Sequence, residues 1–341
     1  MTRARIWQTA ALLVLGLLIL YGLLRTVHPN QVAAAVGRAS PWLVLVGMAS
    51  GVGFILIRGW RWQLILAASA PKTSIADATA VTAVGFAVNS VSPFKLGEIL
   101  RIALITPRSD IGVGEAGATV VLERVLDVLV LLVLAVATAL ASGGGSKGAG
   151  IWGGLALLSG VSLAFGVAAY IVVRHPAGSL RVAGVATGVL PHRLRAAALG
   201  LAESALKGFS LLRSPGRFAL TIVVSLAVWI VPILGLIAYV RSVTPVLAPV
   251  TLFLALTLFV ITQAVTVTPA AVGTYEGLFL LVLGAFGAGP ATVLTAAAVV
   301  AHIGGVFISL LVGAAGALWL RFRPARLPVR FEGPAVSEHS T

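Results

Sequence analysis

Cysteine is absent from the 341-residue chain, and acidic residues are scarce, with 10 Asp and Glu in total. The absence of cysteine excludes disulfide frameworks, thiol catalysis, iron–sulfur clusters and Cys-ligated zinc. The five histidines never occur as a pair four residues apart, which is the spacing by which one helix face ligates zinc. The sequence therefore predicts no metal site, no cofactor and no catalytic residues.

Charged residues of both signs are also few. They make up 10% of the chain, against roughly 25% in soluble domains, while 59% of the residues are hydrophobic. This composition predicts an all-α, polytopic membrane helix bundle with about eight apolar segments, each near the roughly 20 residues that cross a bilayer. A net charge of +14 at pH 7 would suggest nucleic acid in a soluble protein, but the cations here are scattered between apolar runs. We expect no nucleic-acid partner.

The same pattern interrupts the apolar sequence twice, at residues 89–101 (NSVSPFKLGEILR) and 266–277 (TVTPAAVGTYEG). Each copy has a hydroxyl residue before a proline, then a glycine, then a glutamate. The matching residues are Ser92, Pro93, Gly97 and Glu98 in the first copy, and Thr268, Pro269, Gly273 and Glu276 in the second. Because proline disfavours continued helix, each copy predicts a break between two half-helices, and we expect the half-helix after the first break at residues 98–105. Paired breaks in the two halves of a membrane protein are typical of a transport site and of an inverted repeat.

A glycine-rich stretch at residues 142–150 divides a predicted transmembrane domain, residues 1–320, into halves of about 1–141 and 151–320. Residues 174–217 are basic and include a segment with helical apolar spacing, so we expect an amphipathic cytoplasmic helix on the membrane surface. A cytoplasmic N terminus would place most cations on one side, together with the basic and then polar tail at 321–341. The sequence thus predicts a multi-pass protein of the inner cell membrane with both termini cytoplasmic.

Charged residues inside the predicted spans are a separate signal. Glu123, Arg124 and Asp127 interrupt a long aliphatic segment, and a charge at a helix centre costs roughly 2.5–3.5 kcal/mol on insertion scales. We therefore expect this intramembrane polar cluster to face the bundle interior, either as a polar site or as a lock between helices. His302 also lies in an apolar run, where it is either a buried histidine satisfied by a neighbour or a proton relay.

Tryptophan marks the predicted ends of the spans. Six of the seven tryptophans fall near such ends, while Trp229 lies in the middle of a span. The second predicted span runs from residue 41 to about residue 57. It is followed by Arg58, Arg61 and Trp62, and indoles and cations suit the headgroup layer. We interpret these three residues as interface anchors.

The two breaks carry charges that allow more than one role. Glu98 can pair with Arg101 at i, i+3, and its place at the start of a half-helix is also that of a simple cap. Lys95 and Arg101 are candidates to attract a lipid phosphate, since cations near unpaired N–H groups form an anion site. Glu276 has the equivalent place in the second copy. The predicted lipid-binding residues are Asn89, Pro93, Lys95, Gly97, Glu98, Arg101, Pro269, Gly273 and Glu276.

Four motifs together resemble the lysylphosphatidylglycerol synthase transmembrane (flippase-like) family over about residues 6–320. They are Arg58-x-x-Arg61-Trp62, Asn89 to Arg101, Glu123-Arg124-x-x-Asp127 and Pro269-x-x-x-Gly273-x-x-Glu276. The resemblance implies a lipid-translocating membrane domain. Lys95 stands where related sequences often carry arginine. A lysine here would keep the charge of a phosphate site but lose the bidentate geometry of a guanidinium. The chain ends soon after the last span, so we expect no soluble aminoacyltransferase domain and no lysyl-lipid synthesis.

Three functions are compatible with these features. The first is translocation of a membrane lipid, anionic or of the polyprenyl-phosphate type, between leaflets. The second is an enzyme or accessory subunit that acts on a polyprenyl phosphate or a lipid-linked sugar. The third is a scaffold that recruits an unknown protein partner through residues 174–217. We expect the first, because the paired breaks and the resemblance both indicate a transporter rather than an enzyme.

Overall fold

The computed structural model describes most of the chain and is helical in all its regular structure. It covers residues 3–92, 95–142, 175–188, 214–244, 247–263 and 268–323, with isolated positions between 160 and 211. The predicted all-α class is therefore confirmed for the described residues. Three helices there are long and apolar enough to cross a membrane: α3 (Pro41–Leu66), α10 (Pro215–Val243) and α13 (Ala291–Phe322). Three predicted segments lie mostly outside these ranges: a span that the apolar run at 152–173 predicts, the amphipathic surface helix, which the apolar spacing places at 194–212, and the tail at 321–341.

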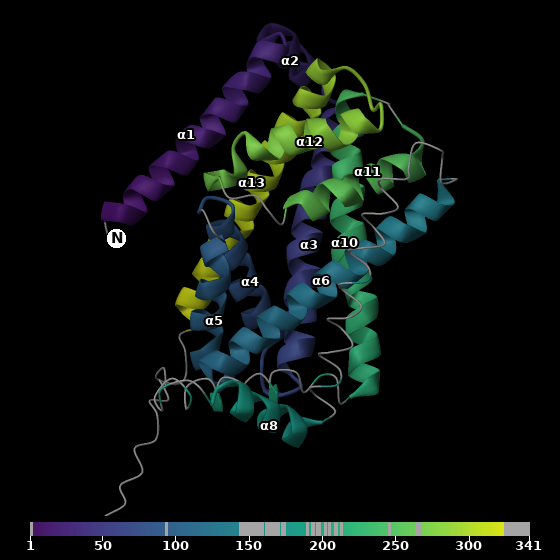
Figure 1. Ribbon diagram of the computed structural model, residues 1–341. Helices are drawn as coiled ribbons and strands as arrows, with labels where there is room; N and C mark the ends of the chain where they lie inside the picture. The colour runs from purple at the N-terminus through teal and green to yellow at the C-terminus, as the bar shows by residue number, and fades with distance from the viewer. Residues whose placement is uncertain are drawn as a thin grey trace, which may run out of the picture.

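One order of elements occurs twice along the chain: a long helix, a broken pair, and a second long helix. The first set is α3, α4 (Ile75–Asn89), α5 (Leu96–Ser109) and α6 (Val113–Ala141); the second is α10, α11 (Pro249–Thr262), α12 (Thr274–Ala285) and α13. The two sets pack reciprocally, since α3 lies along α10, α4 along α13, and α11 along α6. Figure 1 shows α3 and α10 side by side, with α5 toward one end of the bundle and α12 toward the other.

Three helices of the described residues lie outside the two sets. They are α1 (Arg3–Thr26), α2 (Pro29–Gly37) and α8 (Pro176–Ala186). In Figure 1, α1 extends along one edge of the bundle, and it packs against α12 and the second break. Gly16 makes this contact, because a Cβ at Gly273 would overlap the carbonyl oxygen of Gly16.

Both predicted breaks are present. The first lies between Asn89 at the end of α4 and Leu96 at the start of α5, and Lys95 there has a left-handed φ of 52°. Pro93 itself lies outside the described residues. The second contains a short 3-10 turn, η4 (Pro269–Ala271), and ends at Gly273, which precedes α12. Ala270 and Ala271 both have positive φ, a region that residues with a Cβ rarely adopt.

Two boundaries differ from the sequence-based expectation. The second predicted span ends near residue 57, whereas α3 continues to Leu66. The half-helix after the first break is predicted to end at Ile105, whereas α5 continues through Pro107 to Ser109. The last turns of α5 gain support from side chains, since Thr106 Oγ1 donates to Ile102 O and Arg108 Nη1 donates to Leu104 O, both at 2.8 Å. These bonds help the helix to continue past a proline that removes one backbone donor.

The half-helices α4 and α5 pack backbone against backbone at two glycines. A Cβ at Gly97 would overlap the carbonyl oxygen of Gly85, and a Cβ at Gly85 would lie 2.5 Å from Arg101 Cγ. The Gly97 amide also donates to Asn89 Oδ1 at 2.8 Å, which ties the start of α5 to the end of α4. The broken pair is thus held closed by contacts that only glycine permits.

Gly97→Ala is expected to lower the thermal stability of the purified protein, because the added methyl group forces α4 and α5 apart. Overpacking of this kind costs about 1–3 kcal/mol. Gly117→Ala on α6 is the matched control, since its Cβ would come no closer than 3.7 Å to Ile102 Cδ1. The melting temperature in detergent measures both variants; equal values for the two would show that the half-helices do not need this contact.

Candidate functional site

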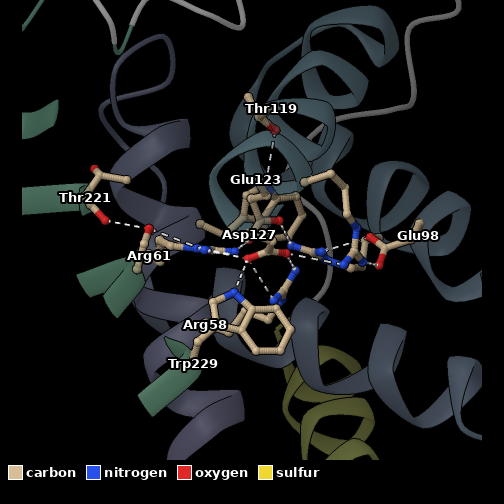
Figure 2. A network of polar contacts seen from close by, with 12 residues as sticks. Arg58, Arg61, Glu98, Thr119, Glu123, Asp127, Thr221 and Trp229 are labelled. Carbon is tan, nitrogen blue, oxygen red and sulfur yellow. Dashed lines mark hydrogen bonds and ion pairs between the residues drawn. The ribbon is translucent and has the colours of Figure 1, made fainter. Parts of the chain in front are cut away.

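A buried network of ion pairs joins α3 to α6. Arg58 Nη2 lies 2.7 Å from Asp127 Oδ2, and Arg61 Nη1 lies 2.7 Å from Asp127 Oδ1. Arg61 Nη2 also lies 3.2 Å from Glu123 Oε1. These four side chains are at most 5% exposed. Their spacing, three residues on α3 and four on α6, puts each pair on one helix face, so the two faces meet (Figure 2).

The half-helix α5 extends this network. Arg101 Nη2 lies 2.5 Å from Glu123 Oε2, and Arg101 Nη1 lies 2.9 Å from Glu98 Oε2. Arg124 pairs with Glu98 and, at 3.4 Å, with Asp127 Oδ2. Four arginines therefore surround three carboxylates, and the network is left with net positive charge.

Aromatic side chains complete the surroundings of Arg58. Its guanidinium lies 5.7 Å from the ring centroid of Phe54, 5.2 Å from Phe86 and 6.0 Å from Trp229. Trp229 also donates from Nε1 to Asp127 Oδ1 at 3.0 Å, which brings α10 into the network. The rings stabilise the cation and keep its orientation fixed.

The predicted interface anchors are not at the surface. Arg58, Arg61 and Trp62 are each 0% exposed, because α3 continues beyond the expected boundary and turns all three residues inward. Trp62 Nε1 donates to Thr119 Oγ1 at 3.1 Å, and the Arg101 guanidinium lies 4.1 Å from the centroid of the Trp62 ring. The interface interpretation is therefore wrong, since carboxylates of α6 compensate the buried arginines.

A cavity of about 550 Å³ lies beside this network and reaches both breaks. Most of its wall is apolar and comes from α3, α6, α10, α11 and α13. One group of polar lining residues consists of Asn89, Lys95, Arg58, Arg124 and Asp127. A second group consists of Thr268, Tyr275 and His302. The cavity thus combines a long apolar wall with a cationic region at the first break.

The lipid-binding residues predicted at the first break divide into two sets. Asn89 and Lys95 line the cavity. Gly97, Glu98 and Arg101 lie behind them in the contact between α4, α5 and α6, where Asn89 Nδ2 donates to Glu98 Oε1 at 3.4 Å. The first break therefore presents Lys95 to the cavity, while Glu98 and Arg101 join the charged network.

The second break presents different atoms from those predicted. Pro269, Gly273 and Glu276 are not among the lining residues, whereas their neighbours Ala270 and Tyr275 are. Glu276 caps α12, because its Oε2 accepts from the Gly273 amide at 2.9 Å. Its Oε1 lies 2.6 Å from His302 Nδ1 on α13.

Several lining residues were not among the predicted site residues. Trp229, Tyr239 and His302 belong to long apolar helices and carry no motif. Two of them had a signal in the sequence: Trp229 is the tryptophan placed in the middle of a span, and His302 is the histidine within an apolar run. Among the described residues, no group of three or more His, Asp or Glu side chains is arranged to hold a metal ion.

Comparison with protein families gives a match over nearly the whole chain. The model described as "Lysylphosphatidylglycerol synthase TM region" matches residues 8–313, which include both breaks and the charged network. Comparisons with curated protein sequences and with solved structures give no match.

Proposed function

Because the chain belongs to the lysylphosphatidylglycerol synthase transmembrane family, we propose that this integral membrane protein moves a phosphate-bearing lipid between the leaflets of a bacterial inner membrane. Its termini lie in the cytoplasm in this proposal, as the distribution of cations favours. The observation that carries the proposal is the cationic region of Arg58, Lys95 and Arg124 on the wall of a largely apolar cavity.

The charge balance favours an anionic headgroup. The network holds one arginine more than it holds carboxylates, and Lys95 adds a further basic group at the cavity wall. Arg58 Nε is buried and has no hydrogen-bond partner among the described residues. A phosphate placed here would compensate the excess charge and accept charge-assisted hydrogen bonds, for which guanidinium groups are well suited.

The remainder of the cavity favours a lipid over a soluble phosphate. Phe54, Ile55, Leu131 and Val260 are among the apolar residues of the wall. A volume of about 550 Å³ is in the range of ordinary ligand cavities and suits a headgroup with the first part of its acyl chains. The rest of the chains would stay in the surrounding bilayer.

An inverted repeat would provide the two conformations that transport needs. The repeated order of elements and their reciprocal packing support such a repeat. One side-chain contact also recurs in the two sets: Glu98 pairs with Arg124 in the first, and Glu276 pairs with His302 in the second. Each contact joins the half-helix after the break to the next long helix, and in both the partners are 26 residues apart. In transporters of this kind the repeats move against each other around a site at their interface.

Lys95→Gln is expected to slow the transfer of labelled phosphatidylglycerol about tenfold in reconstituted vesicles, since it removes one charged contact worth roughly 1.5 kcal/mol. Lys95→Arg should retain most of the rate. Lys72→Gln, an exposed lysine in the turn between α3 and α4, is the matched control. The measurement is the fraction of fluorescent lipid that an impermeant quencher cannot reach over time. No transfer by the unmodified protein, or an unchanged rate in Lys95→Gln, would contradict the proposal.

A further inference from the structure

The hydrogen bonds of His302 show how many protons its site holds. Its Nδ1 lies 2.6 Å from Glu276 Oε1, and its Nε2 lies 2.8 Å from the carbonyl oxygen of Ala270. A carbonyl oxygen can only accept, and so can an ionised carboxylate, whereas a neutral imidazole has one donor and one acceptor nitrogen. Both contacts are therefore satisfied in two ways: by an imidazolium beside a carboxylate, or by a neutral imidazole beside a protonated Glu276. In either case the pair holds one proton more than a neutral imidazole with a carboxylate.

Loss of that proton would remove one of the two contacts. One ring nitrogen would then face an oxygen acceptor with no hydrogen between them, at a distance of 2.6 or 2.8 Å. Glu276 has little freedom to move away, because its Oε2 already accepts from the Gly273 amide. The contact to Ala270 is the weaker of the two, since its acceptor is uncharged. Deprotonation would thus release the ring from η4.

The segment that His302 holds is strained. Ala270 and Ala271 have φ values of 51° and 53°, which are unfavourable for alanine. Such backbone persists only where surrounding contacts enforce it. Both residues line the cavity, so a movement of this segment would change the cavity at the second break.

The surroundings of His302 suit a site that gains and loses a proton. Its side chain is 13% exposed and lines the cavity, which gives the ring access to protons from there. The Tyr275 ring stacks on it with centroids 4.3 Å apart, which fixes its orientation. In the first set of helices Arg124 has the corresponding place, and an arginine stays charged at all ordinary pH values.

Few other ionisable groups lie on the elements packed around His302. In the described residues, α11, η4 and α2 carry none. Tyr275 and Glu276 are those of α12, and Tyr239 of α10 also lines the cavity. Eight other ionisable side chains are described on α1, α3, α4, α10 and α13, and each is engaged elsewhere or exposed at the surface: Tyr21, Arg25, Arg58, Arg61, Asp77, Arg217, Arg241 and Arg321.

We infer that Glu276 and His302 form a proton-binding site, and that release of its proton opens the second break toward the cavity. In this inference the proton is the coupling ion of lipid transport, and that part rests on the proposed function. The proton passes from the pair to water in the cavity and returns to the same pair when the break closes. The first break, with Arg124 in place of histidine, does not respond to pH.

The absence of cysteine from the chain permits a direct test in detergent, without any lipid substrate. Ala271→Cys places a thiol on the cavity wall at the second break, and Ser92→Cys places one at the first. Each single-cysteine protein is labelled with a maleimide between about pH 5 and about pH 8, the range in which histidines generally change charge. The labelling rate of the Ala271→Cys protein divided by that of the Ser92→Cys protein cancels the pH dependence of thiol chemistry itself.

The ratio of the two labelling rates is expected to rise about tenfold from low to high pH. Loss of the proton removes one hydrogen bond that involves a charged group, and such a bond is worth about 1.5 kcal/mol, which corresponds to a factor of about ten. Glu276→Gln should keep the ratio low throughout, because its amide can donate to His302 Nδ1 and leave Nε2–H for Ala270 without an added proton. His302→Arg, which imitates Arg124, is a second variant with the same expected result. A flat ratio in the unmodified background, or the same rise in Glu276→Gln, would overturn the proton site. A failure of lipid transfer alone would contradict the proposed function but not the proton-binding site, because the labelling experiment requires no transport.

Discussion

Asp127→Asn is expected to remove a large part of the stability of the folded protein. Asp127 forms ion pairs with Arg58 and Arg61 at 2.7 Å and with Arg124 at 3.4 Å, and it accepts from Trp229. The amide would leave Arg58 without its ionised partner and would leave Arg61 with Glu123 alone, in a network that already has net positive charge. Removing one member of a buried ion pair costs about 3–5 kcal/mol, which is a large part of the total stability of most proteins.

Glu115→Gln is the matched control for this prediction. Glu115 lies in the first turn of α6, on the same helix as Asp127 but outside the charged network, so the variant makes the same change in charge elsewhere. Thermal unfolding in detergent compares the two proteins. We expect a melting temperature far below that of the unmodified protein for Asp127→Asn and little change for Glu115→Gln. Equal melting temperatures would show that the network does not hold α3, α6 and α10 together.

Gly305→Phe is expected to abolish lipid transfer while the protein remains folded. Gly305 lines the cavity on α13, and no atom lies within 4 Å of a Cβ built there. A phenylalanine can therefore enter the cavity without a clash and would occupy the space proposed for the acyl chains. We expect a loss of more than about tenfold, because a bulky ring in a ligand site excludes the ligand rather than weakening one contact.

The control for Gly305→Phe makes the same substitution outside the cavity. Gly284 on α12 is exposed, and no atom lies within 4 Å of its Cβ position either. Gly284→Phe should transfer labelled lipid at the normal rate. Both variants should melt within a few degrees of the unmodified protein. If Gly305→Phe instead lowers the amount of folded protein in proportion to the lost transfer, the result would not support the cavity as the lipid path.

The fold class, the breaks and the family could be predicted from the sequence because each depends on local chemistry. Composition indicates helices in a membrane, and Pro269 with Gly273 marks the break that precedes α12. The burial of Arg58, Arg61 and Trp62 could not be predicted in this way. A helix that is apolar on all sides gives no periodic signal to show which face is buried, and the pairing of Arg58 with Asp127 spans 69 residues.

Which of the predicted residues line the cavity, and which lie behind it, could also not be predicted from the sequence. The sequence predicts Glu98, Arg101 and Lys95 all as lipid-binding residues, yet Lys95 lines the cavity while the other two lie behind it. Which side chain faces a cavity depends on helix packing, and here it depends on the contact between Gly85 and Gly97. The sequence showed His302 only as a histidine within an apolar run. Its partners could not be predicted, because Glu276 lies on α12 and Ala270 lies in η4.

Mass spectrometry of the lipids that co-purify with the protein tests the lipid site most directly. The unmodified chain and Gly305→Phe are each extracted from membranes of the same composition, and the retained lipids are compared with the bulk membrane. We predict that the unmodified chain retains a phosphate-bearing lipid enriched over its share of the bulk, and that Gly305→Phe loses this enrichment. Retained lipids that match the bulk composition equally in both proteins would contradict a lipid site in the cavity between the two breaks.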